Sequence, residues 1–156
     1  MDIYALRMKE WIDKNGVEAD FMSFSKSVHS VKEAVEATGY PQERFTKSIV
    51  ILTSSNDVVV AVVPGDSRAS TERVRKALNL AERPRTATAS EIERHLAQLM
   101  GGNSPLNAPN ARILIDPKVL EKDWIITGGG DSRSLVRISI EELRRVVDFV
   151  EVRVRK

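Results

Sequence analysis

Residues 48–63 read SIVILTSSNDVVVAVV, and this stretch decides the fold class. Its two apolar runs, Ser48–Thr53 and Val58–Val63, have the length and β-branched content of strands. Continuous apolar runs of this kind are typical of strands that are buried on both faces. The intervening residues 54–57, SSND, are typical of a tight turn. The stretch therefore predicts a buried β-hairpin.

Further strands are predicted along the rest of the chain from short apolar runs between turn residues. They are expected at Asp20–Phe24, Arg112–Ile115, Trp124–Thr127, Leu135–Ile138 and Phe149–Arg155. In the last of these, Val150, Val152 and Val154 alternate with charged residues. That alternation predicts a half-buried strand with a charged outer face.

Helices are predicted between these strands. Apolar residues at helical spacing indicate a helix over Tyr4–Lys14 that ends at Gly16, and another helix covers Thr71–Leu78. Three further helices begin at a Ser-x-x-Glu capping box, at Ser30/Glu33, Ser90/Glu93 and Ser139/Glu142. Because strands and helices are interleaved irregularly, we expect one α+β domain with a mixed sheet over residues 1–156.

Composition excludes several classes of protein. The chain has 156 residues, of which 42% are hydrophobic and 29% charged, as in ordinary globular domains. It contains no cysteine, which excludes disulfides, thiolate metal sites and cysteine nucleophiles. No apolar run approaches the length of a membrane span. We therefore expect a cytoplasmic protein with no membrane partner.

Cofactor and metal chemistry find no support in the sequence motifs. Neither Gly101-Gly102 nor Gly128-Gly129-Gly130 continues into a dinucleotide-binding or P-loop motif. The two histidines, His29 and His95, are far apart and have no carboxylates at metal-ligand spacing. We expect neither a metal nor a cofactor.

Four features remain as candidates, and each has a structural alternative. The glycine clusters at 101–102 and 128–130 are able to present backbone N–H groups to an anion, or else form a helix cap and a strand-to-strand turn. Ser104 is a nucleophile or, more simply, a loop serine, since the closing glycine of a nucleophile elbow is missing. Lys47 is a candidate for contacting a phosphate, and its structural alternative is a solvated surface charge.

Several short motifs follow one another along the chain: HSVKEAVEATG (29–39), FTKSIV (45–50), VVVAVVPGD (58–66), ATASE (87–91), GGNSP (101–105), Asp116 and GGG (128–130). In this order they resemble one family, the YbaK-like editing domain associated with prolyl-tRNA synthetase. The similarity extends over roughly residues 20–147. The sequence departs from the family at Asn107, where a glycine is common. It also departs after Gly130, so no acidic catalytic residue is carried over from that second stretch.

The resemblance implies a mixed, barrel-like sheet flanked by helices, and a free-standing hydrolase that deacylates mischarged aminoacyl-tRNA carrying a small amino acid. Its partners would be the aminoacyl-tRNA 3′ end and an aminoacyl-tRNA synthetase. Lys47, Gly102 and Ser104 are then expected to be catalytic, with Gly102 and Gly129 nearest the acyl group as walls of a size filter. The expected substrate-binding residues are Gly101, Pro105, Gly128, Gly129 and Gly130.

A second function remains open, namely a non-catalytic module that binds tRNA 3′ ends or a synthetase partner. Aromatic residues make up only 5% of the chain and the net charge is +2, which disfavours broad RNA binding by base stacking. Lys47 together with two glycine loops favours the enzyme, because a pure binder does not need a tight acyl pocket.

Overall fold

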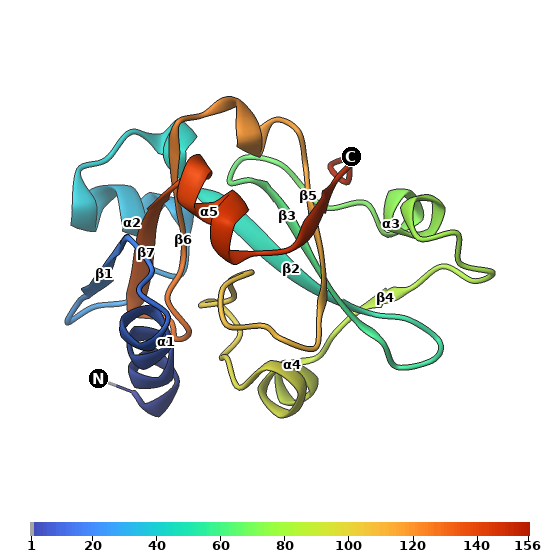
Figure 1. Cartoon of the computed structure of the whole chain (residues 1–156), viewed down its shortest axis with the longest axis horizontal. Helices are drawn as coiled ribbons and strands as arrows, with labels where there is room; N and C mark the ends of the chain where they lie inside the picture. Colours follow the sequence, from blue (N-terminus) through green and yellow to red (C-terminus); the bar gives the residue numbers. More distant parts are fainter. Residues whose placement is uncertain (1) are drawn as a thin grey trace.

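A computed structural model describes residues 2–156 of the chain. Its helices and strands alternate irregularly, as the sequence predicts (Figure 1). The helices are α1 (Ile3–Lys14), α2 (Val31–Thr38), α3 (Thr71–Ala77), α4 (Ala89–Leu96) and α5 (Ile140–Val146), with 3-10 turns η1 (Gln42–Arg44) and η2 (Val119–Glu121). The strands are β1 (Ala19–Ser23), β2 (Thr46–Leu52), β3 (Val58–Pro64), β4 (Arg85–Thr86), β5 (Arg112–Ile115), β6 (Trp124–Gly128), β7 (Ser134–Ser139) and β8 (Phe149–Glu151).

The strands form two sheets rather than one barrel. A three-stranded antiparallel sheet has the order β1-β7-β6, and a five-stranded mixed sheet has the order β4-β2-β3-β5-β8. The predicted hairpin is confirmed as the antiparallel pair β2–β3 at the middle of the larger sheet. The mixed α+β fold is therefore confirmed, whereas the expected barrel-like closure is wrong. Within residues 2–156 the backbone pairing between the two sheets is limited to an isolated bridge between Phe45 and Ile126, which is too short to close a barrel.

The main hydrophobic core lies between the two sheets. One face of β2 and β3 packs with β5, β6, β7, α1, α4 and α5 around residues such as Val60, Ile125 and Leu143. The other face of the larger sheet is covered by α3 and the C-terminal segment. The other face of the smaller sheet packs against α2. The strands of the hairpin are thus buried on both faces, which explains their continuous apolar runs.

Two helix starts differ from the sequence prediction. The capping box at Ser30/Glu33 is confirmed. At α4 the box is formed instead by Thr88 and Glu91, so the predicted box at Ser90/Glu93 is wrong: Ser90 already lies inside the helix. At α5, Ser139 accepts from the Glu142 N–H as predicted, but the Glu142 carboxylate pairs with Arg145 rather than with the cap.

The C-terminal strand is shorter than predicted. It ends at Glu151, because only Phe149–Glu151 pairs with β5. Val150 is 51% exposed, so its predicted burial is wrong, whereas Val154 is fully buried against the second face of the larger sheet. Beyond Glu151 the chain is held by Asp116, whose carboxylate accepts hydrogen bonds from the backbone of Val154 and Arg155.

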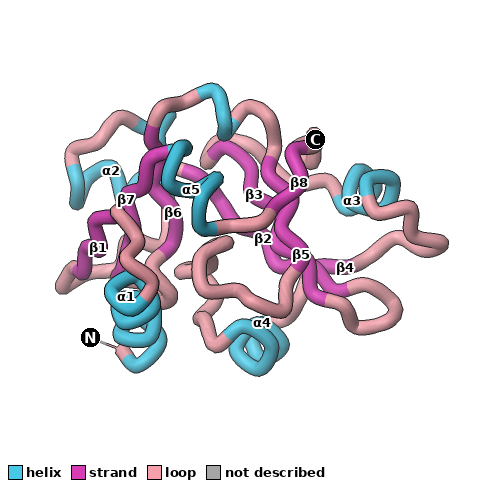
Figure 2. The backbone as a smooth tube through the Cα atoms, in the orientation of Figure 1, coloured by secondary structure: helices cyan, strands magenta, loops and turns pink. Residues whose placement is uncertain are grey.

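Long connections lie beside the sheets (Figure 2). The connection between α4 and β5 contains the GGNSP motif and reaches the end of β6. Within residues 2–156, none of the helices has the length and hydropathy needed to cross a membrane.

Candidate functional site

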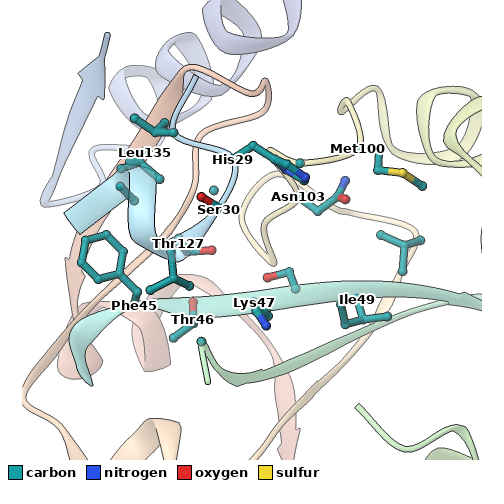
Figure 3. A pocket seen from close by; sticks show the side chains of 18 of the residues that line it. His29, Ser30, Phe45, Thr46, Lys47, Ile49, Met100, Asn103, Thr127 and Leu135 are labelled. Atoms are coloured by element: carbon teal, nitrogen blue, oxygen red, sulfur yellow. The ribbon is translucent and has the colours of Figure 1, made fainter. Parts of the chain in front are cut away.

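A pocket of about 590 Å³ opens where β2, the start of α2, the glycine-containing loop after α4 and the end of β6 meet (Figure 3). Its walls are mostly apolar side chains, among them Val31, Phe45 and Leu135. Polar side chains from β2, β6 and the glycine loop face the same space. An apolar pocket with a few convergent polar groups is the usual form of a small-ligand site.

The two glycine clusters are side by side in space. The N–H of Gly130 donates to the carbonyl of Gly102 at 2.8 Å, and the N–H of Leu99 donates to the carbonyl of Gly130 at 2.8 Å. A Cβ on Gly102 would overlap the backbone of Asp131, and a Cβ on Gly128 would overlap that of Asn103. Glycine is needed at these positions because one backbone segment packs directly on another.

Of the eight predicted site residues, Lys47, Gly101 and Gly128 line the pocket. The pocket lining does not include the other five, Gly102, Ser104, Pro105, Gly129 and Gly130. The helix-cap alternative for the first cluster is wrong, because α4 is capped by Ala97 in a left-handed conformation. The second cluster does form the turn between β6 and β7, with the N–H of Gly129 donating to Ser134.

Ser104 is fully buried and is held inside the loop. Its Oγ accepts from the N–H of Leu106 at 3.1 Å and from the hydroxyl of Thr127 at 3.4 Å. The buried side chain of Gln98 accepts from the Ser104 N–H and donates to the carbonyls of Ser104 and Leu106. Asn107 continues the loop at a φ of 53°, a left-handed conformation that asparagine tolerates. These contacts fix the loop shape next to the pocket.

Lys47 lies at the rim of the pocket. Its side chain is exposed, and strand alternation places it on the same face of β2 as Ile49, opposite to Ser48. Figure 3 shows the Lys47 amine at the edge of β2, away from Asn103. Within residues 2–156 the amine forms no ion pair with a carboxylate. It is therefore available to an anion that approaches from solvent.

Two polar atoms in the pocket wall were not singled out from the sequence. Ser48 Oγ and Asn103 Nδ2 are both buried, and neither has a hydrogen-bond partner within residues 2–156. Both residues line the pocket. A buried polar atom without a partner costs free energy, so a ligand that pairs with these atoms would be favoured. Alternation along β2 was the available signal for Ser48, since it points to the opposite face from Lys47.

His29 forms the other side of the entrance. It precedes the cap residue of α2, and its ring lies so close to Gly101 that a Cβ there would overlap Nδ1 (Figure 3). The capping carboxylate of Glu33 accepts from the backbone N–H and the hydroxyl of Ser30, which lowers the pKa of Glu33. The start of α2 is thereby fixed beside the pocket.

Comparison with known proteins identifies this architecture. The aminoacyl-tRNA editing domain family matches residues 25–146, a range that contains every residue of the pocket. The chain belongs to the aminoacyl-tRNA editing domain family. No curated protein matches the chain of this editing domain in sequence.

Solved structures share the fold of this editing domain at low sequence identity. One, described as a candidate trans-editing enzyme for prolyl-tRNA synthetase, is 20% identical with a TM-score of 0.89, and the match covers 100% of this chain and 99% of that one. A hypothetical protein is 24% identical with a TM-score of 0.83, covering 96% and 99%. A scaffold protein from epitope backbone grafting is 16% identical with a TM-score of 0.88, covering 100% and 99%.

Proposed function

We propose that this editing domain acts in trans as a hydrolase that deacylates mischarged aminoacyl-tRNA carrying a small amino acid. The observation that carries the proposal is the pocket, which has unpartnered polar atoms in its wall and lies within the part of the chain that matches the editing family. Its volume of about 590 Å³ suits a terminal nucleoside bearing a small acyl group. Lys47 at the rim would bind a phosphate of the tRNA 3′ end.

The proposed reaction requires no protein nucleophile. Water attacks the ester carbonyl, the bond to the ribose oxygen breaks, and that oxygen leaves with a proton, giving a free amino acid and tRNA. An aminoacyl ester is already activated, so positioning of the water and stabilisation of the oxyanion supply the catalysis. The fully buried Ser104 supports this route, since its hydroxyl is directed to Leu106 and Thr127 rather than to solvent.

The glycine walls would limit the size of the acyl group by their backbone positions. The hydrogen bonds between the loop at Gly102 and the turn at Gly130 keep both segments close to the pocket. A rigid wall discriminates by excluding larger acyl groups, which is how an editing site complements a synthetase with limited discrimination.

The decisive experiment is incubation of the protein with a panel of mischarged tRNAs, with release of the amino acid as the measurement. We expect release from one or more small aminoacyl-tRNAs and none from aromatic ones. Binding of tRNA 3′ ends without release from any member would support the non-catalytic module instead.

A further inference from the structure

The ionisable side chains that line the pocket are those of His29 and Lys47. All other lining residues are apolar or carry a neutral hydroxyl or amide, and no Asp or Glu of residues 2–156 is among them. The substrate of the proposed function has an α-amino group two bonds from the ester carbonyl. A protonated α-amine is a cation, and a buried cation requires a charged or strongly polar partner. This pocket offers it no carboxylate, only neutral hydroxyl and amide groups.

Two acidic side chains on the helices that border the pocket are engaged elsewhere. Glu33, on α2, accepts from the N–H and hydroxyl of the cap residue Ser30. Glu91, at the start of α4, forms a bidentate ion pair with Arg85 and accepts from the Thr88 N–H. These carboxylates are used to cap helices and do not line the pocket.

The remaining acids lie outside the pocket as well. Asp131, just after the glycine turn, is 6% exposed and accepts from the N–H of Arg133 within its own turn. Glu43, Asp66 and Glu121 line a neighbouring pocket of about 490 Å³, which shares Phe45, Thr46 and Gly65 with the first. The field at the acyl position is therefore set by neutral dipoles, with the basic groups His29 and Lys47 at the entrance.

Such surroundings favour the neutral form of an α-amine. A free α-amino group titrates with a pKa of about 7.7–8.0, and both burial and nearby cations lower that value. A neutral amine needs only hydrogen-bond partners, which Ser48 Oγ can supply. A hydroxyl group in the same place has the same ability to donate and accept.

We propose that this pocket binds the acyl group with an uncharged α-substituent, so that the protein also deacylates α-hydroxyacyl-tRNA, a class of ester that carries a hydroxyl in place of the amine. The inference rests on the proposed ester hydrolysis. The step is the same: water adds to the ester carbonyl, the ribose oxygen leaves with a proton, and an α-hydroxy acid is released with free tRNA.

The test compares alanyl-tRNA with lactyl-tRNA, prepared from it by deamination with nitrous acid, at pH 6.0 to 8.5. Uncatalysed hydrolysis is subtracted at each pH. The ratio of the two kcat/KM values cancels any pH dependence that the two esters share. We expect the lactyl/alanyl ratio to be highest at low pH and to fall about tenfold per pH unit until the amine is neutral.

Two results would overturn the inference while leaving the proposed function intact. One is a ratio that does not change with pH while alanyl-tRNA is hydrolysed. The other is hydrolysis of lactyl-tRNA more than a hundredfold slower than that of alanyl-tRNA at every pH. If neither ester is hydrolysed and no member of the wider panel is, the proposed function fails and the inference fails with it.

A substitution in the pocket provides a second test, because an added carboxylate should favour the alanyl ester over the lactyl ester. Ser48→Asp introduces the missing carboxylate beside the acyl position, and Ser48→Asn is the neutral control of similar size. We expect Ser48→Asp to lower the lactyl/alanyl ratio at pH 6 at least tenfold relative to Ser48→Asn. Thermal melts verify that both variants are folded, and an unchanged ratio in a folded Ser48→Asp protein would contradict the inference. The wild-type pH comparison decides the matter alone if Ser48→Asp does not fold.

Discussion

The N–H of Gly130 donates a 2.8 Å hydrogen bond to the carbonyl of Gly102 and joins two segments that are 28 positions apart in the chain. Next to this bond, a Cβ on Gly102 would overlap the backbone of Asp131. Gly102 lies in the loop that follows α4, and Gly130 lies in the turn between β6 and β7. Their mutual packing therefore sets the wall of the pocket, and it depends on the absence of a side chain.

We expect Gly102→Ala to destabilise the protein by about 3 kcal/mol or more, because the overlap is with backbone that cannot rotate away. Gly16→Ala is the matched control: Gly16 has a φ of 59°, but an added Cβ would enter open space, so this variant should lose only about 1 kcal/mol. Urea denaturation measures both. Equal losses would show that the loop and the turn are not tightly packed.

Lys47→Ala should reduce kcat/KM for deacylation at least tenfold and leave the melting temperature nearly unchanged, because this side chain is exposed and has no carboxylate partner within residues 2–156. The plot of log K for tRNA binding against log salt concentration should become shallower by about one unit of slope, because one phosphate contact is lost. Lys76→Ala, an exposed lysine on α3, is the control and should change neither quantity. Unchanged turnover in Lys47→Ala would remove this residue from the site.

Ser104→Ala removes an acceptor from the buried N–H of Leu106 and from Thr127. We expect a loss of about 1–3 kcal/mol in stability and a ten- to a hundredfold loss in deacylation rate, since the loop loses its fixed shape. Mass spectrometry of the wild-type protein during turnover should show no acyl adduct. An acyl group trapped on Ser104 would restore the nucleophile hypothesis.

Asp116 connects the end of β5 to the C-terminal segment. Burial opposes ionisation of its carboxylate, but hydrogen bonds from the backbone of Lys118, Arg155 and Val154, and from the Arg155 guanidinium, outweigh this and lower its pKa. A lowered folded-state pKa means that the stabilisation is complete above the ordinary carboxyl range and is lost as the pH falls through and below about 3.9.

Asp116→Asn should therefore cost about 3–5 kcal/mol at pH 7, because the Arg155 guanidinium loses its buried partner. The difference from wild type should shrink as the pH falls from 5 to 3. Asp57→Asn, in the exposed hairpin turn, is the control. Denaturation curves at both pH values measure the difference, and a gap that widens on acidification would contradict the assigned ionisation.

Much of the fold follows from local patterns in the sequence. The run 48–63 predicts its hairpin because both strands are buried on both faces, and Ser30/Glu33 predicts the start of α2 because the two side chains satisfy each other's backbone. The predicted start of α4 was wrong because two possible capping boxes compete there. Thr88/Glu91 and Ser90/Glu93 overlap in the sequence, and the ion pair of Glu91 with Arg85 accompanies the first of them.

The candidate site was determined by the sequence only in part. The resemblance of the ordered motifs to the editing family suggested that Lys47 and the two glycine clusters belong together, and the clusters do meet. Tertiary structure alone decided that the buried Ser48 Oγ has no hydrogen-bond partner, that Ser104 is enclosed, and that no carboxylate lines the pocket within residues 2–156. The physical reason is that local sequence governs hydrogen bonds between near neighbours. The direction of a side chain into a cavity depends on how distant segments pack against one another.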